Sequence, residues 1–196
     1  MNPSRTNKPT NSEQQPEVPA APSTNRSAIT IRQFRDEDLP SVIEIFADGF
    51  PPATSDEEKQ MVAKYVQSSI ESDLGNIAGA YITSGGNFWV ATLVDEADDK
   101  EKVVGMVALE KKLDGDGELR RMSVKKEFRR YGVGKQLVEH LEQWAKQNGY
   151  TSVSLATGEV VKVAQAFYKR MGFEQKHTQL LSEEPHIAII HFSKQL

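Results

Sequence analysis

The chain has 196 residues, of which 38% are hydrophobic and 27% are charged, and its formal net charge is -4. It contains no cysteine, which excludes disulfides, a thiolate nucleophile and Cys-ligated zinc. The acidic balance predicts no nucleic-acid partner, and the four histidines are too scattered along the chain to predict a metal site. These values are typical of one globular domain.

The first 27 residues differ in composition from the rest. They are rich in Pro, Ser, Thr, Asn and Gln, and no aromatic residue precedes Phe34. We therefore expect a disordered tail over 1–27 and a folded domain over 28–196. The tail lacks the apolar core of a secretory signal, and no later stretch is long enough to span a bilayer. The prediction is a cytoplasmic protein, with the nucleus as an alternative, and no membrane partner.

Alternating and helical patterns follow one another through the first half of the domain. A strand at 29–32 precedes a helix that the acids at 36–38 cap and that ends near Phe46. A soluble amphipathic helix follows at 56–72. Strands at 88–92 and 103–108 predict a hairpin across the acidic turn at 95–100, and a second turn at 114–117 leads into a strand at 118–124.

The second half of the domain begins with a basic, glycine-containing turn at 129–135. The helix that follows carries Leu137, Leu141, Trp144 and Ala145 on one face, and Asn148-Gly149 ends it. The remaining predicted elements are a strand at 153–155, a helix at 160–171, and strands at 173–181 and 187–192. This order predicts an α/β fold with a mixed sheet.

The basic turn carries the strongest chemical signal. It reads Arg129-Arg130-Tyr131-Gly132-Val133-Gly134-Lys135. Two glycines let the backbone approach a ligand, and the N–H groups of a helix start join three cationic side chains. Cations at a helix N-terminus oppose its dipole. A pyrophosphate ligand therefore explains the cluster better than a solvated basic surface does.

Two better-known phosphate motifs do not fit this turn. A Walker A loop requires Gly where Arg129 stands and Ser or Thr where Gln136 stands, which disfavours an ATP-dependent phosphotransferase. A dinucleotide fingerprint requires a third glycine where Leu137 stands, and an acid after the next strand. The signature that remains is R-x-x-G-x-G.

This signature, together with a second block, resembles the GNAT superfamily of N-acetyltransferases. The second block is Ala164-Gln165-Ala166-Phe167-Tyr168-Lys169-Arg170-Met171-Gly172-Phe173. A narrower resemblance, carried by Asp73-Leu74-Gly75-Asn76-Ile77, Tyr81 and the segment 85–91, is to the camello-like N-acetyltransferases, without their membrane segment. The resemblance implies a single α/β domain with a mixed, mostly antiparallel central sheet flanked by helices.

The resemblance also implies a reaction and its residues. Acetyl-CoA would donate an acetyl group to a primary amine of a small molecule or protein by direct attack in a ternary complex, without a metal. The backbone of Met122, Ser123 and Val124 would present the thioester. The pyrophosphate would be held by Arg129, Arg130, Tyr131, Gly132, Val133, Gly134 and Lys135. Tyr168 would protonate the leaving thiolate, and Glu118 would receive the amine proton, with Glu110 as its competitor.

Several alternatives stay open at this point. Tyr168 beside Phe167 also fits a core position, and the carboxylates also fit solvated strand ends. Lys125 and Lys126 fit either the adenosine phosphate of the cofactor or a solubilising role. Val161 stands where relatives often carry an Asn or Gln that contacts the pantetheine, and Thr157 or Glu159 could replace it. A catalytically silent acyl-CoA sensor or interaction module is therefore the alternative function, and a homodimer is one possible assembly.

Overall fold

The computed structural model describes residues 28–50, 52–95 and 100–196. The predicted tail at 1–27 and the middle of the predicted acidic turn lie outside them. The elements are β1 (Thr30–Gln33), α1 (Leu39–Ala47), α2 (Asp56–Glu71), β2 (Asn87–Asp95), β3 (Lys100–Lys111), β4 (Asp116–Val124), α3 (Val133–Gln147), β5 (Ser152–Gly158), α4 (Lys162–Arg170), β6 (Glu174–Ser182) and β7 (Ile187–Gln195).

The predicted elements occur in the predicted order, and the mixed, mostly antiparallel α/β class is confirmed. Three short elements were not predicted: 3-10 turns at Leu74–Asn76 and Lys126–Phe128, and a π-helical turn at Ala78–Ile82. The glycines at positions 75 and 79 weaken any helical pattern over 74–82.

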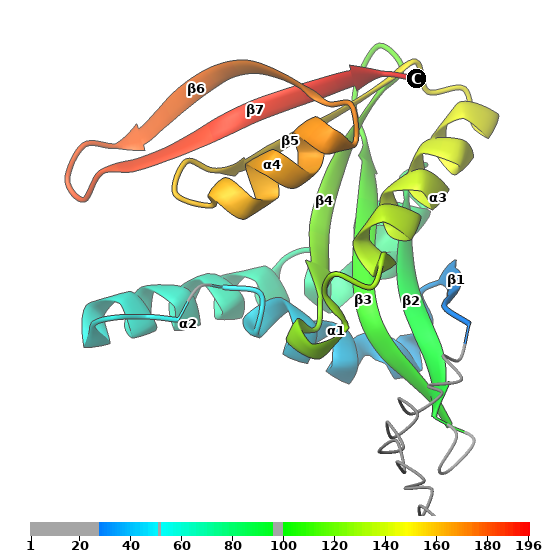
Figure 1. Cartoon of the computed structure of the whole chain (residues 1–196), viewed down its shortest axis with the longest axis horizontal. Coiled ribbons are helices and arrows are strands. Elements are labelled where there is room, and N and C mark those ends of the chain that lie inside the picture. The colour runs from blue at the N-terminus through cyan, green and yellow to red at the C-terminus, as the bar shows by residue number, and fades with distance from the viewer. Residues whose placement is uncertain (1–27, 51, 96–99) are drawn as a thin grey trace, which may run out of the picture.

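The seven-stranded sheet has the order β1-β2-β3-β4-β5-β7-β6. All neighbouring strands are antiparallel except β4 and β5, which pair in parallel over only three residue pairs and end their ladder at Glu118 and Ser154. Beyond that point β5 continues to Gly158 alongside β7, whereas β4 continues alongside β3. The sheet therefore divides into two halves that separate after Glu118 (Figure 1).

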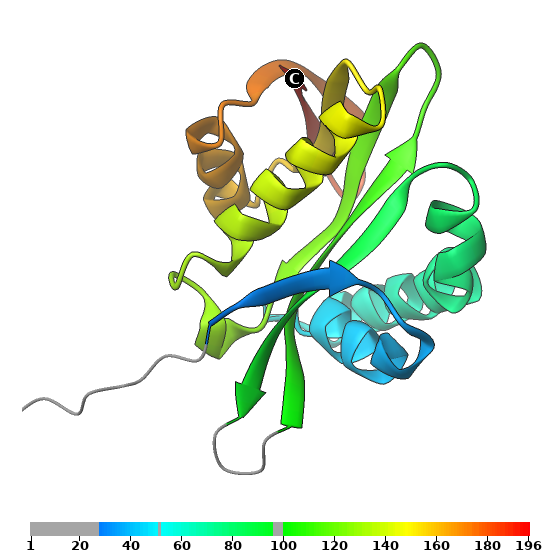
Figure 2. The same cartoon turned by 90° about the vertical axis from the view of Figure 1, so that its right-hand side faces the viewer.

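Helices cover the sheet on both faces. Figure 2 shows α3 and α4 on one side of the sheet and α1 and α2 on the other. On α3 the predicted apolar face is confirmed, because Leu137, Leu141 and Ala145 are fully buried against the sheet. On the opposite side Val42, Ile45 and Phe46 of α1 form a second core cluster with residues of β2 and β3.

The helix α2 is less buried than its predicted amphipathic pattern suggests. Its Met61 and Tyr65 are 48% and 52% exposed, and the helix projects from the body of the molecule (Figure 1). Its C-terminal end, at Ser69, is buried. This buried end of α2 lies next to β4, whose bent part belongs to the candidate site.

Candidate functional site

A bulge bends β4 where the two halves of the sheet separate. Arg121 has a φ of 52°, in the left-handed region, and the β3–β4 register shifts between Met106 and Ala108. After the bulge Ser123 and Val124 still pair with β3. Since Lys125 donates its N–H to Val104 at 2.9 Å, strand alternation directs the Val124 N–H to the other edge of β4, where β5 has diverged.

The side chain of Arg121 fastens this bulge to the end of α2. Its Nε lies 2.8 Å from Asp73 Oδ2, and the hydroxyl of Tyr81 donates to the same carboxylate. The guanidinium also stacks over Phe46, 4.7 Å from the ring centroid. Burial raises the pKa of Asp73, but the hydrogen bonds from Arg121 and Tyr81, together with the charge of Arg121, outweigh it, so the pKa lies below its usual value. This network keeps β4 bent.

The glycine turn ends in an uncapped helix start. Gly132 is the N-cap of α3 with a φ of 83°, and no side chain caps the helix. The first helical hydrogen bond runs from Gln136 N–H to Gly132 C=O at 3.0 Å. The N–H groups of Val133, Gly134 and Lys135 therefore precede the helical ladder and point out of the helix end, where an anion is stabilised.

The turn is joined to the open edge of β4. Arg129 is extended, and its Nε donates to the Val124 carbonyl at 2.9 Å. Arg130 has a φ of 67°, and within the described chain its side chain makes no ion pair. The uncapped end of α3 and the bent end of β4 are thus neighbours.

The remaining residues of the turn differ in what they offer a ligand. Val133 is buried, so its side chain is part of the core and only its backbone N–H is available to a ligand. Lys135 lies 3.5 Å from Glu139 one turn along the helix, and Tyr131 is half exposed. Upstream, Lys125 reaches Glu44 of α1 at 3.1 Å. That ion pair gives Lys125 a structural role beyond the two weighed from the sequence.

Gly134 has a packing role that the sequence did not indicate. A Cβ at this position would lie 3.0 Å from Met122 Cε and 3.6 Å from Phe167 Cζ. Glycine therefore lets α3 approach both β4 and α4 closely. Glycine at position 134 therefore has two separate explanations, the expected room for a phosphate and this close packing of α3.

Tyr168 lies in the core between α4 and the second half of the sheet. It is 7% exposed, and its ring packs edge-on against Phe167 and Phe173 at centroid distances of 5.3 and 5.8 Å. Within the described chain its hydroxyl has no hydrogen-bond partner, and no fully buried side-chain oxygen lacks one. The hydroxyl oxygen of Tyr168 is therefore not completely shielded from solvent. Burial raises the pKa of Tyr168 and keeps the phenol protonated.

Glu118 and Glu110 are cross-strand neighbours and share a cation. Lys112 Nζ lies 2.7 Å from a carboxylate oxygen of each, and Arg120 lies 2.5 Å from Glu110. Burial raises the pKa of Glu110, but hydrogen bonds from Lys112 and Arg120 outweigh it and lower the pKa. Glu110 is therefore a weak base. Glu118 stands at the last paired residue of the β4–β5 ladder.

The turn between β5 and α4 is held by a residue that sequence reasoning did not single out. The buried side chain of Gln165 donates to the carbonyls of Gly158 and Glu159 at 3.1 and 2.7 Å. Val161 is the N-cap of α4 in the same turn. The carboxylate of Glu159 lies 3.1 Å from His186 Nε2, so it is already engaged within the chain.

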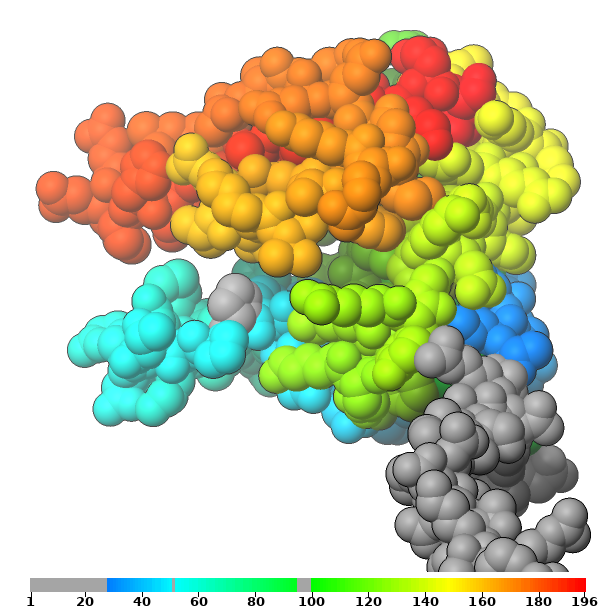
Figure 3. Space-filling model, in the orientation of Figure 1, coloured from blue at the N-terminus to red at the C-terminus, as the bar shows by residue number. Residues whose placement is uncertain are grey.

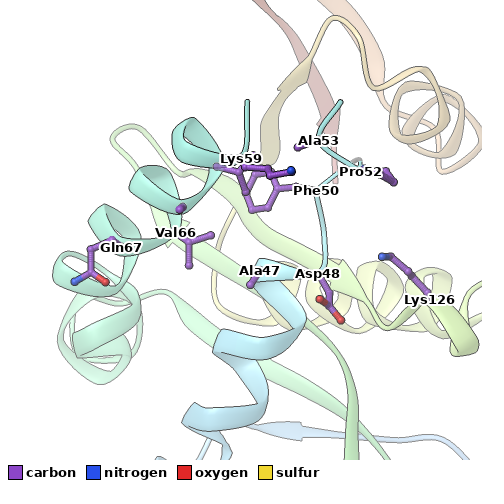
Figure 4. Close-up of a pocket in the computed structure, with 11 residues that line it drawn as sticks. Ala47, Asp48, Phe50, Pro52, Ala53, Lys59, Val66, Gln67 and Lys126 are labelled. Carbon is purple, nitrogen blue, oxygen red and sulfur yellow. The ribbon is translucent and has the colours of Figure 1, made fainter. Parts of the chain in front are cut away.

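The surface is hollowed between the α4 side and the α2 side of the molecule (Figure 3). A separate cavity of about 460 Å³ lies between α2 and the segment after α1, with Lys126 at its rim (Figure 4). None of the predicted site residues lines this cavity. In the described ranges no three acidic or histidine side chains are grouped for a metal, and no helix there is long and apolar enough to cross a membrane.

Comparison of the sequence with known proteins identifies relatives over the same region. N-acetyltransferase family 8 member 2 of Rattus norvegicus is 34% identical over 140 residues, which cover 67% of this chain and 59% of that protein. The probable N-acetyltransferase camello of Xenopus tropicalis is 32% identical over 120 residues (60% and 52%). N-acetylaspartate synthetase of Danio rerio is 33% identical over 119 residues (60% and 40%). The chain thus spans about half the length of these relatives.

Solved structures share the fold at lower identity. PaiA N-acetyltransferase from Thermoplasma acidophilum, in complex with coenzyme A, has a TM-score of 0.66 and 21% identity, covering 86% of this chain and 99% of that one. A putative streptothricin acetyltransferase from Bacillus anthracis, in complex with acetyl coenzyme A, has a TM-score of 0.62 and 20% identity (86% and 100%).

The model of the Acetyltransferase (GNAT) family matches residues 39–173, from the start of α1 to the end of the block that contains Tyr168. The match includes the bent strand, the glycine turn and α3. The expected resemblance is confirmed, with camello among the relatives, and the chain belongs to the GNAT family of acetyltransferases.

Proposed function

We propose that the chain is an acetyl-CoA-dependent N-acetyltransferase that acts on a primary amine. The observation that carries this proposal is the meeting of two features, the uncapped N-terminus of α3 and the edge of β4 that β5 leaves. The first suits a pyrophosphate, and the second suits an extended amide-containing arm. The hydrogen bond from Arg129 to Val124 sets them side by side.

The residues of this chain fit the cofactor in two places. The turn from Arg129 to Lys135, including Tyr131, would hold the pyrophosphate through the amides of the helix start and the cations around it. The backbone of Met122, Ser123 and Val124 would pair with the pantetheine arm. Acetyl-CoA supplies, when bound, the thioester whose acetyl group is transferred. Holding the two reactants in line contributes roughly 7 to 11 kcal/mol in well-oriented reactions.

Two side chains are proposed to handle protons. Tyr168 keeps its hydroxyl proton because the residue is buried. It would protonate the leaving sulfur as the thiolate forms. The family resemblance assigns the receipt of the amine proton, directly or through water, to Glu118, whose carboxylate lies 2.7 Å from Lys112 Nζ.

The acceptor class is proposed from the relatives. They include an N-acetylaspartate synthetase and several N-acetyltransferases, so the panel to test contains aspartate, other amino acids, cysteine conjugates, polyamines and lysine peptides. Acetyl-CoA consumption by the purified chain should occur with one of these classes. A chain that binds coenzyme A and consumes no acetyl-CoA with any amine would contradict the proposal.

One observation favours a second candidate function, a silent acyl-CoA sensor. Val161 brings no polar side chain to the turn before α4, and Glu159 is engaged with His186. Tight coenzyme binding without turnover would support this candidate. The cytoplasmic or nuclear location and the assembly as a monomer or a homodimer stay predictions, which imaging of a tagged chain and light scattering would test.

A further inference from the structure

One face of the sheet is covered over only half its width. The core cluster under α1 contains residues of β2 and β3, and among the described residues it contains none from β5, β6 or β7. On β7 the buried residues Ile190 and Phe192 pack towards α4. Because strand side chains alternate, His191 points to the uncovered face.

The register places His191 beside the gap between the two half-sheets. His191 is paired with Ala156 on β5. Ala156 and Ser154 share one face, and Ser154 is the partner of Glu118 on β4. Two residues past Glu118 the two strands no longer pair, and the exposed Ala156 of β5 lies on the side of His191 that faces the gap. His191 and Glu118 therefore share the open face at the point of separation.

The contacts of His191 define which of its nitrogens can accept a proton. Its Nε2 lies 2.9 Å from Gln179 Oε1. An amide oxygen only accepts hydrogen bonds, so Nε2 of the neutral ring carries the proton and Nδ1 carries the lone pair. The ring of His177 stacks on His191 with centroids 4.3 Å apart and an interplanar angle of 13°. This stacking orients the imidazole.

The two carboxylates on the same face are less suited to take a proton. Glu118 and Glu110 share Lys112, and Glu110 also binds Arg120. The hydrogen bonds from Lys112 and Arg120 lower the pKa of Glu110. Nδ1 of the neutral His191 ring, in contrast, keeps a lone pair that can accept a proton.

We propose, on the basis of the proposed function, that His191 is the general base of the transfer. As the amine nitrogen bonds to the acetyl carbon and the carbon–sulfur bond breaks, the amine proton passes to Nδ1 of His191. Tyr168 protonates the leaving sulfur, and each side chain regains its starting state by exchange with solvent. Glu118 stays paired with Lys112 and does not take part in this proton transfer.

The test compares His191→Gln with His186→Gln, a matched loss of an exposed histidine from the same hairpin. With the acceptor found for the wild-type chain, His191→Gln should lower kcat/KM at pH 7 about 100-fold and remove the acidic limb of the pH profile. His186→Gln should stay within about twofold of wild type. In His191→Ala, added imidazole should restore part of the rate.

Unchanged unfolding midpoints and coenzyme A affinity would show that the variants are folded and loaded. A His191→Gln variant within twofold of wild type, or one that keeps the acidic limb, would overturn the inference. So would a His191→Ala variant that imidazole does not rescue.

A second readout separates this inference from the proposed enzyme function. If the wild-type chain acetylates no amine, the enzyme proposal fails, and the imidazole ¹⁵N spectrum of the coenzyme A complex then decides the role of His191. The spectrum should show the Nε2-protonated form, and added n-butylamine should shift the Nδ1 signal. An Nδ1-protonated ring, or no shift with amine, would contradict the assignment.

Discussion

The two halves of the sheet are built differently. In the first half β3 is buried continuously from Val103 to Leu109, because helices cover both of its faces. In the second half β6 is exposed along almost its whole length, and β7 is buried on the α4 side only. The halves share three residue pairs. The first half of the sheet is therefore covered by helices on both faces, whereas the second half is covered on the α4 face only.

The proposed site takes residues from both halves. The first half supplies Glu118 and the bent backbone of β4, and the second supplies Tyr168 and His191. The halves separate after Glu118, and Tyr168 lies on the α4 face of the second half whereas His191 lies on its opposite face. The predictions below test whether each half of the sheet has a separate role.

The largest expected effect is on kcat, from a substitution in the second half of the molecule. Tyr168→Phe removes only the hydroxyl of a residue that is 7% exposed. We expect kcat to fall by about 10³-fold, since general acid catalysis commonly contributes 10² to 10⁴. Coenzyme A affinity, measured by calorimetry, should stay unchanged. Unaltered turnover would assign the proton donor to another group.

The next effect concerns the bulge of the first half. Arg121→Met leaves the Asp73 carboxylate buried without its cation, which costs about 3 kcal/mol in comparable buried pairs. Denaturant unfolding measures this loss. Lys59→Met, which removes the exposed partner of Asp56 on α2, is the control and should change stability by less than ~1 kcal/mol. An equal loss of unfolding free energy in the two variants would show that the ion pair between Arg121 and Asp73 does not stabilise the bulge.

Two glycines with matched backbones test the phosphate turn. Gly132 and Gly149 have φ values of 83° and 82°, and a Cβ at Gly149 meets no atom within 4 Å. Valine at either position brings similar backbone strain, but only Gly132→Val should weaken coenzyme A binding, by about tenfold, equivalent to ~1.4 kcal/mol. If both variants bind coenzyme A equally well, the turn is not the phosphate site.

The smallest expected effect is in the acid dependence of folding. Asp73 has a pKa below its ordinary value of 3.8 in the folded chain. Its ion pair therefore stabilises the fold above that value, and this contribution is lost as pH falls through the lower, folded pKa. The unfolding free energies of wild type and Asp73→Asn should converge between pH 5 and about pH 2. A constant difference across that range would contradict the ion-pair account.

Local signals explain why much of the fold could be predicted from the sequence. The glycine turn, the face formed by Leu137 and Leu141, and the alternation of the strands act over a few residues, so the sequence displays them directly. The bend of β4 is different, because it depends on Arg121 in a left-handed conformation and on Asp73, 48 residues away. No local pattern specifies such a contact.

The site residues show the same distinction. Tyr168 and the turn at 129–135 were singled out because they lie in short motifs. His191 was noted only as a scattered histidine, because its place beside the gap depends on the β5–β7 register and on where β4 leaves β5. The shared cation of Glu118 and Glu110 also required the β3–β4 register.

The most direct test of the central claim, that the gap between the half-sheets holds the coenzyme, is backbone hydrogen exchange with and without coenzyme A. We expect slower exchange at Met122–Val124 and at Gly132–Lys135, with little change along β6. The account would be contradicted if coenzyme A binds without slowing exchange at these two segments, whether or not exchange slows elsewhere.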